Sequence, residues 1–242
     1  MEEQDYFTHV YTLCPYVCEY ANSREGNTTE YIPMPFPFPG EMFKSLDTDT
    51  KDIDSMFMGT LMCADRFRII DAMRPYKYVH CSLFHYQFPY TPTHVGIPFT
   101  EKIALLARSR ACVVMNICSV ERDPQRDYIR NNKDWDKIEA FNDLECGYIP
   151  QIKPGVFEAM AAKSIVLVKK DPWNVIERYF TEDKHFLYWD TFEELKNIIG
   201  EIKSDPEKFQ HIVDNAYDRV YCFDFKSAMG LIKGEVNELL VR

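Results

Sequence analysis

Two short segments combine residue types that could hold a phosphorylated ligand. In the first, Gly59 and Thr60 follow an apolar run, and Arg66 comes shortly after them. A glycine directly after a strand lets backbone amides approach a ligand closely, and an arginine can reach back to an anion. The alternative is that Gly59 only forms a tight turn and that Arg66 is a solvated surface residue.

The second segment reads Lys153-Pro154-Gly155-Val-Phe-Glu-Ala-Met-Ala-Ala. We expect Glu158 in the first turn of a helix whose other residues are small or apolar. A carboxylate there is favoured by the helix field and can accept hydrogen bonds from two vicinal sugar hydroxyls. The alternative is a helix N-terminal charge that binds no ligand.

Two further residues are weaker candidates. His94 lies in a proline-rich turn near an expected strand end, where an imidazole could act as a general base. A hydrogen-bonded structural histidine is the alternative. Trp173 could stack on a nucleotide base or on a sugar, although most aromatic residues at such spacings pack in a core.

The elements that must position these residues alternate between strands and helices. Strand patterns cover Ile53–Met58, Tyr78–Phe84, Ala111–Asn116, Ser164–Val168 and His185–Tyr188. Helical periodicity covers a segment with Leu61, Phe67, Ile70 and Met73, then Phe99–Arg110, 153–162, a helix started by Pro172, and most of the chain from Thr191 onward. This alternation predicts an α/β, Rossmann-like parallel sheet with helices on both faces and ligands beyond the carboxyl ends of its strands.

The sequence divides into three parts. Residues 1–50 form an N-terminal segment with a proline-rich connector, in which alternate prolines at 33–39 remove the amide donors of a helix or central strand. Residues 51–225 form the Rossmann-like domain, which includes a polar loop at 119–136 followed by a short helix. Residues 226–242 form a C-terminal helix. Thr191 and Glu194 have capping-box spacing, and Asp205-Pro206 is expected to start the next helix.

Composition excludes several classes of protein. Lys and Arg number 28 against 38 Asp and Glu, and the net charge of -10 makes a nucleic-acid scaffold unlikely. The acidic start and the lack of a long apolar run predict a soluble, unexported, cytoplasmic protein with no membrane span. The eight cysteines are expected to be buried free thiols rather than metal ligands or disulfides, with Cys14 and Cys18 the nearest approach to a metal pair.

Residues 153–168 resemble the "FEAMA-x-G-x-x-V" signature in the carboxyl-terminal domain of GT-B glycosyltransferases, notably the family 1/4-like, spore-maturation-type branch. Other segments resemble that domain in the same order. These segments are residues 53–73, 94–116 with a strand ending in Asn116, 185–194 and 217–225. Residues 11–16 and the proline run resemble the end of the first domain of such an enzyme and its hinge.

The resemblance implies that residues 51–225 bind a nucleotide-diphosphate sugar. Glu158 would hold the ribose hydroxyls, and the amides near Gly59 with Arg66 would neutralise the diphosphate. The implied donor-binding set is Gly59, Thr60, Arg66, Asn116, Lys153, Gly155, Glu158 and Trp173, with His94 as the catalytic candidate. Fixed donors that tighten on a departing nucleoside diphosphate lower the barrier without a metal, so no metal or other cofactor is expected.

The sequence departs from the GT-B pattern at several positions. Pro150 stands where retaining enzymes carry a second glutamate, with Glu145 upstream, and Lys163 stands where a glycine is usual. About 50 residues precede the matched domain, whereas a full GT-B enzyme has two Rossmann domains with the acceptor between them.

Three functional hypotheses follow. The first is a glycosyltransferase that moves a sugar to a glycan or another hydroxyl acceptor. The second is a non-catalytic subunit that binds a nucleotide sugar or a partner, with a second chain or a homodimer supplying the acceptor site. The third is an α/β binding module without sugar chemistry.

Overall fold

The computed structural model describes residues 10–12, 18, 22–23, 29–31, 40–61, 64–120, 147–223 and 230. The chain falls into two compact units. The small unit comprises Met1–Met34, Asn116–Lys153 and Asp171–Arg178, and the large unit comprises Pro35–Met115, Pro154–Lys170 and Tyr179–Arg242.

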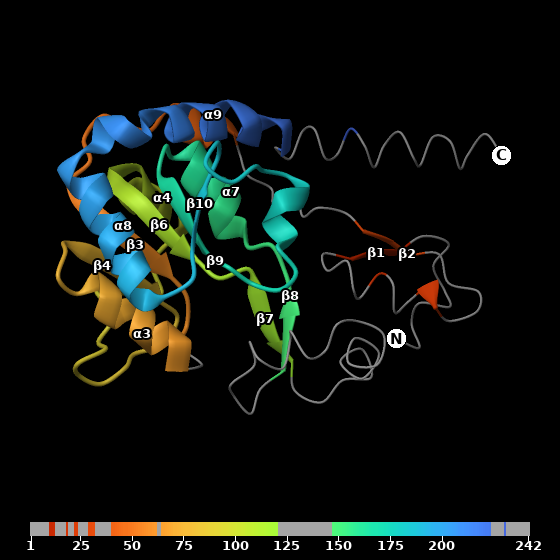
Figure 1. Cartoon of the computed structure of the whole chain (residues 1–242), viewed down its shortest axis with the longest axis horizontal. Coiled ribbons are helices and arrows are strands. Elements are labelled where there is room, and N and C mark those ends of the chain that lie inside the picture. Colours follow the sequence, from red (N-terminus) through yellow and green to blue (C-terminus); the bar gives the residue numbers. More distant parts are fainter. Residues whose placement is uncertain are drawn as a thin grey trace. The chain divides into compact units, whose positions relative to one another are not determined.

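The large unit is built on a six-stranded sheet in which every neighbouring pair is parallel (Figure 1). Its order is β10-β9-β6-β3-β4-β5. The strands are β3 (Ile53–Met58), β4 (Tyr78–Ser82), β5 (His94–Val95), β6 (Ser109–Val114), β9 (Ile165–Lys169) and β10 (Leu187–Trp189). The predicted Rossmann-like sheet is therefore confirmed. From β3 the chain first adds β4 and β5 on one side and then β6, β9 and β10 on the other, so the strand order reverses between β3 and β6.

Helices cover both faces of this sheet (Figure 1). Helix α3 (Ala64–Met73) packs on α8 (Phe192–Ser204), which contacts β3 and β6. Helix α4 (Phe99–Arg108) packs on α7 (Pro154–Ala161), and this pair contacts β3, β6 and β9. Right-handed crossovers place the two pairs on opposite faces, because β3 to β4 and β6 to β9 run in opposite directions across the sheet. Around α7 lie α2 (Gly40–Lys44) and α9 (Gln210–Val220), and the large unit also has the 3-10 turns η3 (Pro206–Phe209) and η4 (Tyr221–Phe223).

The central strands are apolar because both of their faces are covered. Every residue of β6 from Ala111 to Val114 is buried, as is every residue of β9 from Ile165 to Val168. Helix α8 begins as predicted. The Thr191 hydroxyl accepts from the Glu194 amide, and the Glu194 carboxylate accepts from the Thr191 amide, which satisfies two helix-end donors.

Most element boundaries differ from the sequence prediction by one to three residues, and two differences have a clear local cause. Helix α4 ends at Arg108 and β6 begins at Ser109, earlier than expected, and the Ser109 hydroxyl donates to the Leu105 carbonyl at this junction. The turn after β9 is also different. Asp171 Oδ1 accepts from the amides of Trp173 and Asn174, so Pro172 lies in a side-chain-stabilised turn rather than in a helix. Only the 3-10 turn η2 (Val175–Arg178) follows it.

The small unit contains strand pairs that the sequence pattern did not indicate. Strand β7 (Ile117–Val120) pairs antiparallel with β8 (Gly147–Pro150), and β1 (Val10–Thr12) pairs parallel with β2 (Thr29–Tyr31). The predicted polar loop therefore starts later than 119. The rest of that loop, the connector at 33–39 and the C-terminal helix, apart from residue 230, lie outside the described residues. Within the described part of the chain, no helix combines the length and apolarity needed to cross a bilayer.

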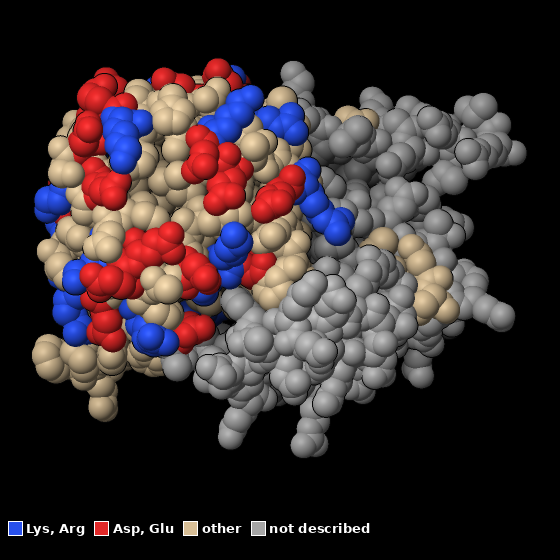
Figure 2. Space-filling model, in the orientation of Figure 1, with Lys and Arg blue, Asp and Glu red and all other residues tan. Residues whose placement is uncertain are grey.

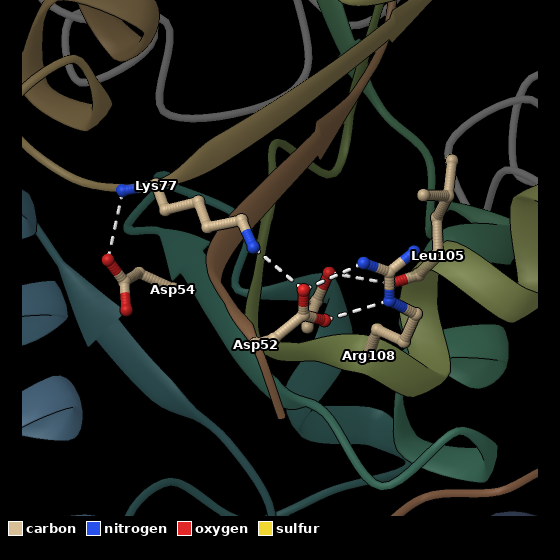
Figure 3. A network of polar contacts seen from close by, with 6 residues as sticks. Asp52, Asp54, Lys77, Leu105 and Arg108 are labelled. Carbon is tan, nitrogen blue, oxygen red and sulfur yellow. Dashed lines mark hydrogen bonds and ion pairs between the residues drawn. The ribbon is translucent and has the colours of Figure 1, made fainter. Parts of the chain in front are cut away.

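Charged residues tie the amino ends of β3 and β4 together (Figure 3). Asp52 accepts from Lys77 Nζ at 2.7 Å and from Arg108 Nε and Nη2 at 2.8 and 2.7 Å. Asp54 accepts from the Lys77 amide at 2.9 Å and from Lys203 Nζ at 2.7 Å. Hydrogen bonds from Arg108 and Lys77 hold the pKa of Asp52 well below its usual range. These carboxylates are thus already matched by neighbouring cations at the amino edge of the sheet.

Candidate functional site

The reversal of strand order between β3 and β6 marks where a ligand would bind. In open parallel sheets, ligands lie in the crevice beyond the carboxyl ends of the strands at such a switch point. The turn at Gly59 directly follows β3. The predicted residues of the large unit are Gly59, Thr60, Arg66, His94, Gly155 and Glu158, and those of the small unit are Asn116, Lys153 and Trp173.

Hydrogen bonds fix the turn after β3. The Gly59 amide donates to the Cys81 carbonyl at 3.0 Å, and the Leu61 amide donates to the Tyr86 hydroxyl at 2.9 Å. Arg66 reaches back to the backbone of this turn, with Nη1 2.7 Å from the Thr60 carbonyl oxygen. Because the Gly59 amide is engaged within the sheet, the charge that this turn offers to an anion comes from Arg66.

Glycines bring the start of α7 against the end of β3. A side-chain carbon added at Gly155 would lie only 3.0 Å from the terminal methyl of Met58, the last residue of β3. A carbon added at Gly59 would lie 3.0 Å from the Phe57 ring. The start of α7 therefore lies against the last residue of β3 at the carboxyl edge of the sheet, whereas the contact at Gly59 is within its own segment.

Glu158 is the candidate acidic residue at this edge of the sheet. It lies in the second turn of α7, not in the first turn as expected, since the helix starts at Pro154 and its first turn holds no acidic residue. Its side chain is only 6% exposed. Oε1 accepts from Lys102 Nζ at 2.7 Å, whereas Oε2 is buried and has no hydrogen-bond partner among the described residues. A buried carboxylate oxygen without a partner is rare and is suited to accept from a ligand hydroxyl.

Sequence reasoning missed Lys102. This residue lies on α4 beside the buried Ile103, and its ammonium lies 4.7 Å from the centre of the Phe99 ring. A lysine among the apolar positions of an amphipathic helix was the signal that could have revealed it. Burial first, and then the Glu158 carboxylate, raise the pKa of the buried Cys112 thiol on β6. Cys112 therefore stays a neutral thiol.

His94 lies on the short edge strand β5 rather than in a turn. Its Nδ1 is 2.9 Å from the Thr93 hydroxyl oxygen, which accepts from the His80 amide and donates to the His80 carbonyl. When the Thr93 hydroxyl donates to the His80 carbonyl, it can only accept from His94 Nδ1, and the tautomer that results keeps Nε2 as an acceptor. Strand β4 separates β5 from β3, so His94 lies about 10 Å along the sheet from the Gly59 turn.

The predicted residues of the small unit form their own contacts. Asn116 Oδ1 accepts from the Lys153 amide at 3.0 Å, while its carbonyl accepts from the Gln151 amide at 2.8 Å. Asn116 is buried, and its Nδ2 has no partner among the described residues. Trp173 is held by the Asp171 turn. Asn116 and Lys153 therefore lie together through the hydrogen bond of the Lys153 amide, whereas Trp173 lies in the turn formed by Asp171.

Cysteines and metals give no further site in the described residues. Cys81, Cys112 and Cys222 are free thiols, and of these Cys81 and Cys112 are buried. In the same part of the chain, no three His, Cys, Asp or Glu side chains are close enough together to hold a metal ion.

Residues 68–223 match a family model described as glycosyl transferase-like. The chain belongs to this family. The stretch of this glycosyl transferase-like chain that matches includes Lys102 and Glu158 but begins after Gly59 and Arg66. No curated protein sequence matches the chain.

Solved structures show the same fold. A sucrose-phosphate synthase from Thermosynechococcus elongatus has 14% sequence identity to the chain and a TM-score of 0.57. The structural alignment covers 98% of the glycosyl transferase-like chain and 59% of the synthase chain. TarM is 9% identical with a TM-score of 0.58, and the alignment covers 98% of this chain and 44% of TarM. A glycosyltransferase from Rickettsia africae is 10% identical with a TM-score of 0.57, and the alignment covers 96% of this chain and 63% of that glycosyltransferase. The sheet and its helices match the carboxyl-terminal domains of GT-B glycosyltransferases, and the chain spans about 59% of the synthase.

Proposed function

We propose that this chain binds a nucleotide-diphosphate sugar and supplies the donor half of a sugar-transfer reaction to a hydroxyl acceptor. The observation that carries the proposal is the buried Oε2 of Glu158, for which the described part of the chain offers no hydrogen-bond donor. A ribose hydroxyl would provide the missing donor. We also propose that the chain belongs to the spore-maturation-type branch, on the strength of the motif at 153–168.

The ion pair with Lys102 suits Glu158 to this role. Lys102 occupies Oε1 and balances the carboxylate charge, which leaves Oε2 to accept from a neutral hydroxyl. A hydroxyl that donates to an ionised carboxylate forms a stronger hydrogen bond than one that donates to a neutral group. We infer that Lys102 is a positioning residue that fixes the direction of the second oxygen.

Arg66 would stabilise the diphosphate. Its guanidinium is anchored by the Thr60 carbonyl, which uses one of its five N–H donors. The remaining donors can bind the negative charge that develops on the leaving group, and we propose that this replaces a divalent cation. His94, with Nε2 kept as an acceptor, is our candidate for the general base. Asn116, Lys153 and Trp173 remain predicted donor contacts.

The second hypothesis, a donor-binding subunit without its own turnover, also has support. A GT-B enzyme binds its acceptor between two Rossmann domains, and the large unit contains one parallel sheet. The chain spans about 59% of the synthase that it resembles in fold. Under this alternative, a partner chain supplies the acceptor site, and the purified chain binds the donor without transferring it.

Binding measurements test the shared part of both hypotheses. Calorimetry of the full chain against UDP-, GDP- and ADP-linked sugars should identify one that binds. Glu158→Gln keeps the shape of the side chain and removes its charge, so it should weaken that ligand about 10- to 100-fold, as expected for the loss of a charged hydrogen bond. Glu201→Gln is the matched control, because Glu201 is exposed on α8 and pairs with Lys208.

Equal affinity of Glu158→Gln and the wild type would refute the ribose-binding role. Turnover by the wild type with simple hydroxyl acceptors would favour the enzyme over the subunit, while donor binding without turnover would favour the subunit. Failure of every nucleotide sugar to bind would leave the α/β binding module.

A further inference from the structure

A cavity of about 350 Å³ lies at the opposite edge of the sheet from Glu158. Three cationic residues line it, namely Lys51, Arg110 and Lys163. Lys51 precedes β3, Arg110 lies at the start of β6, and Lys163 precedes β9. Since these strands are adjacent and parallel, the three side chains gather at the amino edge, about 17 Å along the strands from the carboxyl edge.

Within the described residues, the positive charge in this cavity is not balanced by ion pairs. Neither Arg110 nor Lys163 forms an ion pair with a carboxylate of the described residues, and the Lys51 ammonium donates to the Ala162 carbonyl at 3.1 Å. Of the residues lining the cavity, only Asp49 and Glu207 are acidic, and both are exposed. The nearby carboxylate Asp52 is already matched by Lys77 and Arg108 (Figure 3). Asp54 is matched by Lys203.

The mutual repulsion of these cations is visible at Lys51. Burial foremost, and then the charges of Lys163 and Arg110, lower the pKa of Lys51 to about 7, against a smaller opposing effect of Asp49. Like charges gathered in a half-buried cavity are unfavourable in the absence of an anion. The arrangement is also unexpected in a chain with a net charge of -10, whose visible surface mixes acidic and basic side chains (Figure 2).

Lys163 adds a second, independent feature. Its backbone has a φ of +54°, in the left-handed region that favours glycine and costs other residues about 1–2 kcal/mol. Glycine is the usual residue at this place in the motif that the sequence resembles. A lysine here carries that cost, lines the cavity and has its ammonium 5.0 Å from the Tyr217 ring centre. The strain is thus coupled to the presence of the third cation.

We propose that this cavity is a second binding site that takes a small phosphorylated organic molecule, with its phosphate held by Lys51, Arg110 and Lys163. A guanidinium binds phosphate through two parallel hydrogen bonds, and the two ammonium groups add charge. Ile165, Ile202 and Val213 supply an apolar wall for the organic part. The volume lies in the range of small-molecule sites. This site is independent of the proposed sugar-nucleotide site.

Calorimetry and thermal shift with the full chain test the proposal. The probes are inorganic phosphate and glycerol 3-phosphate, with chloride at matched ionic strength as the reference anion. We expect both phosphates to stabilise the chain above the chloride effect, and glycerol 3-phosphate to bind more tightly because its carbon skeleton contacts the apolar wall. Equal effects of phosphate and chloride would overturn the site, and equal affinity for the two phosphates would overturn the organic ligand class.

Variants localise the site. Lys163→Gly removes a cation and relieves the left-handed strain, so the variant should fold at least as well as the wild type and bind phosphate at least 10-fold more weakly. Arg110→Gln should have the same effect on binding. Lys196→Ala, which removes a half-exposed cation of α8 that pairs with Glu193, is the matched control and should bind like the wild type. Wild-type phosphate affinity in both Lys163→Gly and Arg110→Gln would refute the proposal.

Proton uptake gives a further readout. A bound phosphate should raise the pKa of Lys51, so binding at pH 8 should take up protons from the buffer. Calorimetry in two buffers of different ionisation enthalpy measures this uptake. It should disappear in Lys51→Met, and uptake that persists in this variant would contradict the assignment of Lys51. Glu158→Gln should leave phosphate binding unchanged, and a loss of phosphate binding in that variant would contradict the separation of the two sites.

Discussion

Lys102 Nζ lies 2.7 Å from Glu158 Oε1, although the two residues are 56 positions apart in the sequence. The contact joins α4 to α7 on one face of the sheet. The Lys102 side chain is 26% exposed and that of Glu158 is 6% exposed, so the carboxylate depends on this cation for most of its charge compensation. The same ion pair therefore contributes to the stability of the domain and fixes the direction of Glu158 Oε2.

Lys102→Met should therefore destabilise the domain more than removal of both charges. The single change leaves a buried carboxylate without its cation, which we expect to cost about 1–3 kcal/mol, below the range for fully buried pairs because Lys102 is partly exposed. Lys102→Met combined with Glu158→Gln should recover part of this loss. Urea unfolding followed by circular dichroism measures the cycle, and strictly additive effects would show that the two charges are not coupled.

Arg66→Ala should discriminate between ligands. The guanidinium is expected to contact phosphate oxygens and not the base or ribose, so the change should weaken a nucleotide-diphosphate sugar at least 10-fold more than the bare nucleoside. Arg68→Ala is the matched control, because Arg68 is on the same helix with its guanidinium 4.2 Å from the Phe192 ring centre. Equal losses for sugar nucleotide and nucleoside in Arg66→Ala would argue against a phosphate contact.

His94→Gln should lower kcat without changing the affinity for the donor, if the chain transfers sugar on its own. Loss of a general base typically costs about 10²–10⁴-fold in rate. Thr93→Val removes the hydroxyl that orients the imidazole and should produce a smaller loss in kcat. Steady-state kinetics with separate donor titrations measures both. A His94→Gln variant that retains wild-type kcat would exclude this histidine as the base.

His80 should make stability depend on pH. Burial lowers the pKa of His80 below the ordinary value of 6.5, against a smaller opposing effect of its hydrogen bond to Gly59, and its Nδ1 has no partner in the described structure. Between the folded-state pKa and 6.5, the unfolded chain binds a proton that the folded chain does not, so stability falls as the pH drops through this window. His185 has a pKa lowered in the same direction.

His80→Gln should reduce this pH dependence without abolishing it, because the His185 contribution remains. Glutamine can still donate to the Gly59 carbonyl, which limits the structural cost of the change. Unfolding free energies measured at intervals from pH 7 to pH 5 provide the test. An unchanged slope in His80→Gln would show that His80 already takes up a proton in the folded state.

Local features were predictable from sequence because they depend on neighbours in the chain. The alternation of apolar runs and helical periodicity gave a parallel sheet, and β3 starts and ends at the predicted residues. The capping box at Thr191 and Glu194 formed as expected, since its partners are three positions apart. Glu158 was found from its motif, although its helix starts too early to place it in the first turn.

The sequence alone thus determined the fold class, the turn after β3 and the acidic residue that could meet a ligand. Only the tertiary structure decided which partners those groups have. Pairing across the sheet engages the Gly59 amide with Cys81, and packing of two helices gives Glu158 its cation Lys102. The same non-local pairing gathers Lys51, Arg110 and Lys163 in one cavity. Such contacts depend on the spatial order of the strands in the sheet, which periodicity along the chain does not encode.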